Sequence, residues 1–356
     1  MTNNQKFKLF NQIMADYQQK INLELEKFFQ RKIKEAGLIS QKAADTIKVL
    51  KEFNLRGGKR ARPILINTGY FLAGGRDKKA ILKASLCAEL IHNFFLIHDD
   101  IIDQDELRRG KLSLHALYQK KFGGNSYKGV SFAIIAGDIG NVLGFQALTE
   151  SNFSERNKIK ALNILNEMVE RTCHGEMLEM FLKEEKKIKK SDIEKVLKYK
   201  TAYYAFVAPL KIGAVLAGGN SKLLKKIEKF ALPVGSAFQI QDDILGIFGS
   251  QKKIGKPVGS DITENQPNLL IRKTLSLAKA EARRKFQNYL GKSKISQKDI
   301  CDIRRIIKES GALDYCRRKA EKLVKEAKAS MLKFTLPGKE KQFLLDLSDY
   351  VIKRDY

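Results

Sequence analysis

Apolar residues recur at steps of three and four positions along most of this chain, the spacing that places side chains on one face of an α-helix. The pattern is clear over residues 17–37, 43–55, 77–103, 155–185, 191–218 and 221–249. Glycine or proline interrupts it where helices should end, at Gly37, Gly57–Gly58, Gly74–Gly75, Gly123–Gly124, Gly218–Gly219 and Pro337–Gly338. The alternation that is typical of strands is absent.

This pattern predicts an all-α protein with a single domain, residues 1–356, of about a dozen helices. No Gly/Ser-rich linker or low-complexity segment divides the chain. We expect one long irregular loop, from Gly249 to roughly Leu269.

Composition narrows the class of protein. The N-terminal residues contain no continuous apolar segment, so we expect no secretory signal, and no uncharged apolar run approaches the ~20 residues that span a bilayer. Four scattered cysteines form no CxxC pair: Cys87, Cys173, Cys301 and Cys316. Their spacing argues against a zinc site or a disulfide framework and favours a cytoplasmic location.

The formal net charge of +27 is compatible with nucleic acid, an anionic membrane surface or an anionic small substrate as partner. Much of the excess lies in residues 183–200, at helical spacing and mixed with glutamates, which favours solvated helix faces. Because no helix-turn-helix, zinc-finger or RNP motif is present, we expect no nucleic-acid partner. Weak association with a membrane surface stays open.

Two acidic pairs follow apolar helical runs: Asp99–Asp100 in "LIHDDIID" and Asp242–Asp243 in "FQIQDDILG". Asp99 and Asp103 are four positions apart, so a helix places them on one face about 6 Å apart. Buried carboxylates require compensation of their charge, and carboxylates together with substrate phosphates are typical ligands of Mg²⁺. One such motif alone could simply cap a helix. Two of them predict helices that face each other across a cavity and share a cation.

Basic motifs indicate phosphate binding. "RGGKRARP" places Lys59, Arg60 and Arg62 beside an expected helix start, where backbone N–H groups also attract anions. Arg108 and Arg109 follow the first acidic motif by about one turn, and guanidinium groups bind phosphate in bidentate fashion.

Further donors are Lys200, Thr201 and Lys256. His92 lies two turns before Asp99 on the same face, although a lone histidine could equally be a hydrogen-bonded core residue. Two separate basic sites indicate two phosphorylated substrates, one held by metal ions and one by side chains. The surrounding apolar and aromatic residues indicate that the rest of each substrate is hydrophobic.

Five motifs in this order resemble those of the trans-isoprenyl diphosphate synthases, the polyprenyl synthetase family, in particular the short-chain farnesyl and geranylgeranyl diphosphate synthases. The motifs are "LRGGKRARP", "LIHDDIIDQDELRRG", "YKTA", "FQIQDDILGIFG" and "GKPVGSD", over about residues 50–270. The resemblance implies helices around a central cavity, a homodimer, and three Mg²⁺ ions per active site. It also implies condensation of an allylic diphosphate with isopentenyl diphosphate, by ionisation, attack of the double bond and loss of a proton.

The resemblance implies a role for each matching residue. The metal ligands would be Asp99, Asp100, Asp103, Asp242 and Asp243. Isopentenyl diphosphate would bind to Gly58, Lys59, Arg62, His92 and Arg109. The allylic diphosphate would bind to Arg108, Lys200 and Lys256. The residues that act in catalysis would be Lys200, Thr201, Gln239, Asp99 and Asp103, with Thr201 and Gln239 near the developing cation.

The chain departs from the family pattern at four positions. Gly246 stands where the second acidic motif usually has its third aspartate, which implies looser metal coordination. Gln266 and Asn268 replace a lysine and a threonine, so one diphosphate contact is expected to be lost. Leu112 replaces a proline, and we expect this change to be harmless.

Product length should depend on what closes the cavity. Phe94 and Phe95 lie five and four positions before Asp99, so a growing chain would meet an aromatic ring after about 6–8 Å of helix. Two rings resemble the short-product members, which favours a C15 product, with C20 next. Alternatively, one ring faces a neighbouring helix and closes nothing.

Three other functions fit parts of the sequence. A non-catalytic regulatory subunit of a prenyl synthase would explain Gly246 and Gln266 but not the intact DDxxD and Arg-Arg motifs. A terpene cyclase needs no isopentenyl diphosphate site, so the "GGKRARP" motif counts against it. A basic helical protein that binds nucleic acid or membranes would need none of these motifs.

Overall fold

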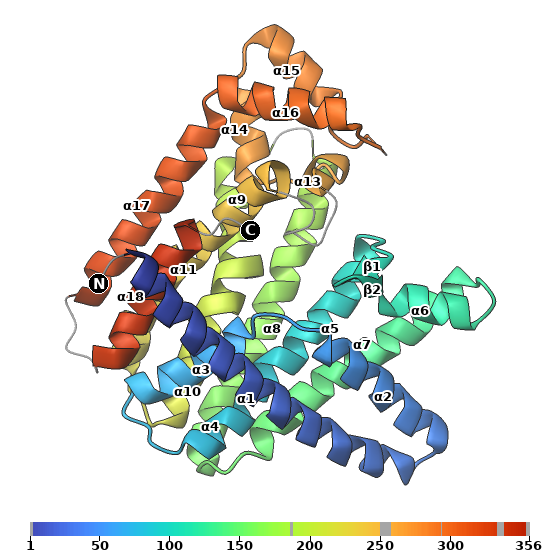
Figure 1. Cartoon of the computed structure of the whole chain (residues 1–356), viewed down its shortest axis with the longest axis vertical. Coiled ribbons are helices and arrows are strands. Elements are labelled where there is room, and N and C mark those ends of the chain that lie inside the picture. The colour runs from blue at the N-terminus through green and yellow to red at the C-terminus, as the bar shows by residue number, and fades with distance from the viewer. Residues whose placement is uncertain (1–2, 186–187, 250–257, 293, 333–337, 354–356) are drawn as a thin grey trace. The chain divides into compact units, whose positions relative to one another are not determined.

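The computed structural model describes residues 3–185, 188–249, 258–292, 294–332 and 338–353 (Figure 1). Most of these residues are helical. The only strands among them are the two of a short antiparallel hairpin, β1 (Leu107–Arg108) and β2 (Lys111–Leu112). The prediction of an all-α protein is therefore confirmed.

The chain divides into two compact units. The first unit contains Met1–Ile164 and Pro209–Asn220, and the second unit contains Leu165–Ala208 and Ser221–Tyr356. The single domain expected over residues 1–356 stays a prediction, since each unit is compact in its own right.

The first unit consists of helices α1 to α7, the hairpin, the beginning of α8 and most of α10. The bounds are α1 Asn3–Gly37, α2 Gln41–Leu55, α3 Ala61–Leu72, α4 Lys78–Ala84, α5 Leu86–Ile102, α6 Leu114–Lys121, α7 Ser126–Thr149, α8 Glu155–Glu184 and α10 Ala208–Leu216.

Helix α5 forms the core of the first unit, and Leu86, Leu90 and Ile91 are at most 2% exposed. It packs along α7. A Cβ atom added to Gly144 of α7 would lie only 2.5 Å from Cγ1 of Ile91, so the glycine permits a close approach of the two helices. This packing fixes the orientation of α5, which ends in the first acidic motif.

The second unit contains the end of α8 and the following elements: α9 Lys190–Val196, η1 Leu197–Val207, α11 Ser221–Phe248, α13 Ser260–Thr263, α14 Leu269–Leu277, α15 Ala280–Gln287, α16 Gln297–Glu309, α17 Ala312–Leu332 and α18 Gly338–Lys353. Helix α11 is central, because it packs against both η1 and α17.

Element η1 is a π-helix, whereas the periodicity predicted one continuous α-helix over residues 191–218. It contacts α11 closely, and a Cβ atom on Gly235 would lie 2.6 Å from Cα of Ala202. Because π-helical turns have a wider spacing than α-helical ones, a period of 3.6 residues does not identify them. These turns carry Lys200 and Thr201.

The long loop that was expected from Gly249 to about Leu269 is only partly irregular. Residues 250–257 lie outside the described residues. After Gly259 the chain forms the short helix α13, and α14 then begins at Leu269.

By length and composition alone, two segments of the described residues could cross a membrane, Lys78–Ile102 and Ser126–Thr149. Within the first segment 78% of the apolar window is buried, and within the second 39% is buried. The search for uncharged apolar runs in the sequence identified neither segment, because both segments contain charged residues. A buried core helix passes the same test, so these two helices are weak evidence for a membrane protein.

Candidate active site

Asp99 and Asp103 lie on one face at the end of α5. The N–H group of Asp103, which caps the helix, donates a hydrogen bond to the carbonyl oxygen of Asp99 at 2.8 Å. This bond completes one helical turn, so both side chains project from the same face. Both are partly exposed. The shared face agrees with the spacing, and their role as metal ligands stays a prediction.

Asp100 is fully buried and forms an ion pair with Arg108 of β1. Nε of Arg108 donates to Oδ1 of Asp100 at 2.6 Å, and a terminal guanidinium nitrogen donates to the same oxygen. Burial lowers the pKa of Arg108, but the hydrogen bond and charge of Asp100 outweigh this effect, so the net shift is upward. In this structure, a residue expected to bind the allylic diphosphate therefore compensates the charge of an expected metal ligand.

Arg109 and Gly58 depend on each other. Arg109 has a left-handed backbone (φ 54°), and its guanidinium group donates to the carbonyl oxygen of Gly57. Gly58 has φ 115°, and a Cβ atom there would lie 2.9 Å from a guanidinium nitrogen of Arg109. Gln18 of α1 donates to the carbonyl oxygen of Gly58 at 2.6 Å. The Gly-Gly loop is thus shaped so that this arginine can lie against it.

His92, on α5, has a pKa that its surroundings lower. Burial lowers its pKa well below the usual value, and the positive charges of Arg62, Arg109, Arg108 and Arg60 lower it further. A neutral imidazole inside a group of arginines can donate or accept a hydrogen bond without adding to the positive charge. The arginines favour an anion beside His92, and its role in binding isopentenyl diphosphate stays a prediction.

Arg60 does not belong to the anion site in which the sequence placed it. Its side chain is only 2% exposed and forms an ion pair with Glu89 of α5. It also donates to Asn22 at 2.9 Å and to the carbonyl oxygen of Asn54 at 2.7 Å. Arg60 therefore anchors the loop before α3 to three helices, and the side chains left for anion binding in this motif are Lys59 and Arg62.

Phe94 and Phe95 are both buried, and their ring centroids are 4.8 Å apart. The Phe94 ring also lies 4.6 Å from that of His98. Phe94 faces α7, because a Cβ atom on Gly140 would lie 4.0 Å from its Cβ. The Cβ atom of Phe94 thus lies against α7 at a position where that helix has no side chain, whereas its ring contacts the rings of Phe95 and His98.

Lys200, in the second unit, forms ion pairs with two glutamates of α8. Its Nζ lies 2.9 Å from Glu176, and it also contacts Glu179, one turn further along. Gly175 allows this arrangement, since a Cβ atom there would lie 2.5 Å from the backbone nitrogen of Lys200. The lysine is held in place by carboxylates that a bound diphosphate could replace.

Thr201, Gln239 and Asp243 form a hydrogen-bonded chain. The Thr201 hydroxyl donates to Oε1 of Gln239 at 2.7 Å, and Nε2 of Gln239 donates to Oδ1 of Asp243 at 2.8 Å. The family resemblance implies that Thr201 and Gln239 lie near the developing cation. In the structure, Gln239 links Thr201 to Asp243, an expected metal ligand. The chain fixes the orientation of the Gln239 amide.

Asp243 is a buried carboxyl group among other acids. Burial raises its pKa well above the usual value, the charge of Asp261 raises it further, the hydrogen bond from Gln239 lowers it, and Asp242 and Glu179 again raise it. Among the described residues, its Oδ2 atom has no hydrogen-bond partner. Such a group is poorly compensated by protein alone.

The remaining departures from the family pattern have local roles. Asn268 accepts a hydrogen bond from the N–H of Ile271 at the start of α14 and donates to Asp261. Gln266 donates to Glu264. The carbonyl oxygen of Leu112 accepts a hydrogen bond from Arg56. Lys256, which the sequence assigns to the allylic diphosphate, lies outside the described residues.

No group of three or more His, Cys, Asp or Glu side chains able to hold a metal ion occurs within the described ranges. Mg²⁺ often takes only one or two carboxylates from the protein and completes its shell with water and substrate phosphates. The separate acidic pairs therefore remain suitable for a metal that arrives together with a diphosphate.

Comparisons with known proteins decide the family. Residues 45–307 match the family model described as polyprenyl synthetase. The geranylgeranyl diphosphate synthase of Sulfolobus acidocaldarius is 34% identical over 304 residues, which are 84% of this chain and 87% of that protein. The chain belongs to the polyprenyl synthetase family.

Two further similarities cover almost the whole chain. The geranylgeranyl pyrophosphate synthase of Geoglobus acetivorans is 30% identical over 349 residues, 98% of this chain and 100% of that protein. A crystal structure of a geranylgeranyl pyrophosphate synthase from Corynebacterium glutamicum, in complex with isoprenyl diphosphate and magnesium, has a TM-score of 0.90 at 28% identity. It covers 95% of this chain and 98% of the solved one.

The resemblance inferred from the five motifs is thereby confirmed, and the chain is a prenyltransferase of the short-chain trans-isoprenyl diphosphate synthase type. The roles given to individual residues remain predictions. Three acidic residues that interact with predicted residues or with Asn268 were not themselves predicted from the sequence: Glu176, Glu179 and Asp261. Only Asp261 lies in a quoted motif, "GKPVGSD", which was a signal that could have been used.

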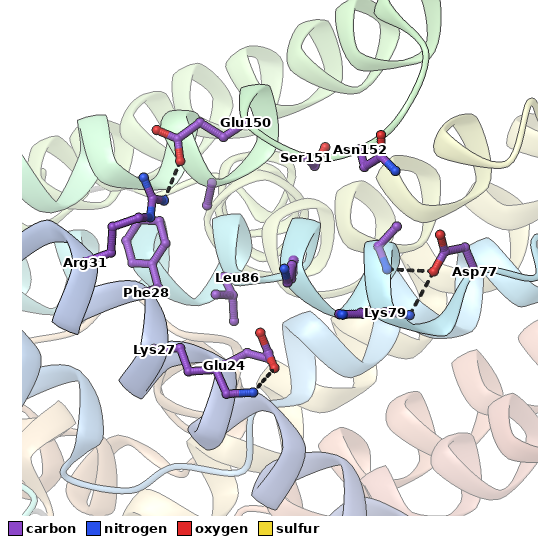
Figure 2. A pocket seen from close by; sticks show the side chains of 13 residues that line it. Glu24, Lys27, Phe28, Arg31, Asp77, Lys79, Leu86, Glu150, Ser151 and Asn152 are labelled. Atoms are coloured by element: carbon purple, nitrogen blue, oxygen red, sulfur yellow. Dashed lines mark hydrogen bonds and ion pairs between the residues drawn. The ribbon is translucent and has the colours of Figure 1, made fainter.

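The first unit also contains a large pocket that is separate from these residues (Figure 2). Its volume is about 970 Å³, and Phe28, Arg31 and Glu150 are among the residues that line it. Figure 2 shows Arg31 paired with Glu150 and Lys27 paired with Glu24. Because none of the predicted site residues lines this pocket, we do not assign the reaction to it.

Proposed function

We propose that this polyprenyl synthetase condenses an allylic diphosphate with isopentenyl diphosphate and releases geranylgeranyl diphosphate (C20) as its main product. The sequence alone favoured C15 with C20 next. The two relatives and the solved structure compared above are all named as geranylgeranyl diphosphate synthases, which supports C20. Isoprenoid diphosphates as substrates agree with the basic and acidic groups of both units.

The observation that carries this proposal is the pairing of two features in the first unit. Asp99 and Asp103 form an acidic ridge at the end of α5. Two turns earlier on the same helix, the pKa of His92 is lowered by burial and by the positive charges of several arginines. One helix thus presents a metal-binding group and an anion-binding group, as a reaction between two diphosphates requires.

The residues fit a divalent cation. Asp243 has a buried carboxylate oxygen without a hydrogen-bond partner among the described residues, and neighbouring acids oppose its ionisation. Oxygen donors of this kind suit Mg²⁺, and the similar Corynebacterium glutamicum structure contains magnesium. We propose Mg²⁺, with three ions per active site as the resemblance implies. When bound, the metal neutralises charge that develops on the departing diphosphate.

The chain's own residues bind and orient the two substrates. We assign isopentenyl diphosphate to Gly58, Lys59, Arg62, His92 and Arg109, where cationic and backbone groups surround a neutral imidazole. Arg109 is well suited, since its guanidinium group is fixed against the Gly57–Gly58 loop. These contacts hold the diphosphate of a substrate that does not ionise.

We assign the allylic diphosphate to Arg108, Lys200 and Lys256, and metal binding to Asp99, Asp100, Asp103, Asp242 and Asp243. Substrate binding would transfer Lys200 from Glu176 and Glu179 to phosphate oxygens. The prediction that both acidic pairs share metal ions stays a prediction.

The proposed reaction replaces a carbon–oxygen bond by a carbon–carbon bond. The allylic C–O bond breaks, and its electron pair leaves with the diphosphate. The double bond of isopentenyl diphosphate then attacks the allylic carbon, and loss of a proton forms the new alkene. Thr201 and Gln239 direct oxygen atoms toward the developing positive charge, and their mutual hydrogen bond fixes them beforehand.

The test is incubation of the purified chain with labelled isopentenyl diphosphate, Mg²⁺ and each of the C5, C10 and C15 allylic primers. We expect every accepted primer to be extended and the products to end mainly at C20. Chromatographic sizing reads primer choice and chain length together. No incorporation of label with any primer would contradict the proposal.

We further propose a homodimer in the cytoplasm. Phe132, Ile135 and Val142 of α7 are 47%, 60% and 54% exposed and share one helix face. Exposed apolar residues on one face favour burial against a second copy.

The buried thiols of Cys87 and Cys316 are compatible with a reducing compartment. Light scattering of the purified chain tests the dimer, and fractionation of cells tests the location.

A further inference from the structure

Element η1 carries Lys200 and Thr201 on π-helical turns, in which each N–H group donates to the carbonyl oxygen five positions back. The N–H of Ala208, at its end, donates to Tyr203 in this way. π-Helices are rare and mostly limited to a single turn. A run of eleven residues therefore requires contacts with neighbouring elements that favour it.

Helix α8 contacts η1 along one of its faces. Glu167, Arg171 and Gly175 are spaced four positions apart, so they lie on the same side of α8. Gly175 lies against the backbone of Lys200, where a Cβ atom would be 2.5 Å from the backbone nitrogen. Arg171 and Glu167 contact η1 one and two turns earlier on α8. This face of α8 thus follows η1 over about two turns.

Tyr203 is the residue of η1 that Glu167 and Arg171 contact together. It is 1% exposed, and its hydroxyl donates to Oε2 of Glu167 at 2.6 Å. The guanidinium carbon of Arg171 lies 4.5 Å from the centroid of the Tyr203 ring and 5.8 Å from that of the Tyr199 ring. Arg171 also forms an ion pair with the other carboxylate oxygen of Glu167. One carboxylate and one guanidinium group thus hold both the hydroxyl and the ring of Tyr203.

The hydroxyl of Tyr203 keeps its proton, so it can act as this donor. Burial raises the pKa of Tyr203, and the hydrogen bond to Glu167 and the charge of that carboxylate raise it further. Arg171 lowers it, and Glu228 again raises it. Since a hydrogen bond to an ionised acceptor is stronger than one between neutral groups, the contact attaches η1 firmly to α8.

Helix α11 holds η1 at a second point. The Thr201 hydroxyl donates to Gln239 at 2.7 Å, and a Cβ atom on Gly235 would lie 2.6 Å from Cα of Ala202. A shift of one residue within a helix rotates the side chains that follow by about 100°. Because Thr201 bonds to α11 and Tyr203 bonds to α8, such a shift would break one of the two contacts. Together they fix the register in which η1 presents Lys200 and Thr201.

We propose that Glu167 and Arg171, acting through Tyr203, are positioning residues for Lys200 and Thr201, because they hold η1 in its π-helical register. This inference rests on the proposed function, since it concerns the residues assigned there to the allylic diphosphate and the developing cation. Glu167, Arg171 and Tyr203 have no assigned contact with either substrate, so their effect on the reaction is indirect.

Hydrogen–deuterium exchange tests the contact between α8 and η1 without turnover. Tyr203→Phe removes the hydroxyl group and keeps the ring. We expect the amides of residues 197–207 to exchange about fivefold faster or more, because loss of the bond favours local opening, while the amides of α17 exchange as before. Glu167→Ala should have the same effect, and thermal unfolding establishes that each variant is folded. Unchanged exchange of η1 in either folded variant would overturn the proposal.

The second unit offers two matched controls. Tyr289→Phe also removes a hydroxyl that donates to a carboxylate, that of Asp302 at 3.3 Å. Glu170→Ala removes a glutamate of α8 that lies beside His174 instead. Neither change should alter the exchange of η1.

A double variant shows whether Tyr203 and Glu167 act through one bond. Tyr203→Phe in the Glu167→Ala chain should exchange within about twofold of Glu167→Ala alone, because the bond is already lost. Effects that multiply would contradict a shared contact.

Steady-state kinetics separate positioning from general stability. Tyr203→Phe should lower kcat about tenfold and raise the KM for the allylic diphosphate. The KM for isopentenyl diphosphate should not change, since the residues assigned to that substrate lie in the first unit. Equal rises of both KM values, or an unchanged kcat in a chain whose η1 exchanges faster, would overturn the positioning role. If the unmodified chain extends no primer, the proposed function fails, whereas the exchange results still decide whether Glu167 and Tyr203 hold η1.

Discussion

At the residue scale, the adjacent basic residues Lys59 and Arg60 have different roles. Lys59 is exposed, whereas Arg60 is buried and paired with Glu89. Both follow the same Gly-Gly turn, so the sequence alone could not separate them. The separation comes from the left-handed backbone of Arg60, which turns its side chain into the core.

Replacing Arg60 should therefore affect stability, whereas replacing Lys59 should affect substrate binding. Arg60→Ala leaves Glu89 as an uncompensated buried charge, and we expect a loss of about 3–5 kcal/mol in the free energy of unfolding. Lys59→Ala should leave this free energy within about 0.5 kcal/mol and raise the KM for isopentenyl diphosphate. Urea unfolding and steady-state kinetics measure the two effects. Equal destabilisation by both changes would show that the loop is not anchored as described.

The raised pKa of Asp243 predicts how the stability of the metal-free protein depends on pH. Because burial and neighbouring acids raise the pKa of Asp243 in the folded state, its ionised form destabilises the metal-free protein above that pKa. This cost disappears as the pH falls through the raised pKa toward the unfolded value near 3.8.

Asp243→Asn should therefore raise the Tm of the metal-free chain at pH 7.5, by about 2 °C or more, and abolish most activity. The difference in Tm between variant and unmodified chain should shrink at acidic pH. Thermal unfolding with a chelator present, at a series of pH values, measures this. A lower Tm for the variant at pH 7.5 would contradict the assignment of Asp243 as a strained carboxylate.

At the element scale, the α5–α7 contact is the feature that should limit product length. The Cβ atom of Phe94 lies where α7 has Gly140, so that residue has no side chain to refill the space if the ring is removed. Phe95 contacts the Phe94 ring and reinforces this barrier.

We expect Phe94→Ala to lengthen the product beyond C20 by at least one C5 unit, and Phe94→Ala with Phe95→Ala to lengthen it further. Phe71→Ala is a control, because Phe71 lies on α3 and contacts Tyr70 instead. Chromatography of the products reads the result. Unchanged chain length in the double variant would place the end of the cavity elsewhere.

At the scale of the whole molecule, comparison of the structure with the expectations from the sequence shows which features a sequence can predict. The helices and the Asp99–Asp103 ridge follow from spacing alone, since a period of 3.6 residues fixes which side chains share a face. The π-helix η1 and the pairing of Asp100 with Arg108 do not, because they depend on packing against other elements. Asp261 was missed for the same reason: it faces Gly246 only through the fold of an intervening loop.

The oligomeric state is also a property of the whole molecule. If α7 forms the homodimer interface, Ile135→Asp should dissociate the dimer, because a charge would be buried in the apolar contact. Leu38→Asp, at a residue that is 89% exposed elsewhere in the first unit, should leave the mass unchanged. Light scattering across a concentration series measures both. A dimer that survives Ile135→Asp would contradict the proposed interface.

The most direct test of the account is one turnover with the C15 allylic diphosphate, labelled isopentenyl diphosphate and Mg²⁺. The unmodified chain should form a C20 diphosphate, and either a chelator or the exchange of Asp99 and Asp103 for asparagine should prevent it. Formation of the same product at the same rate after that exchange would contradict the central claim that metal ions on this acidic ridge drive prenyl transfer.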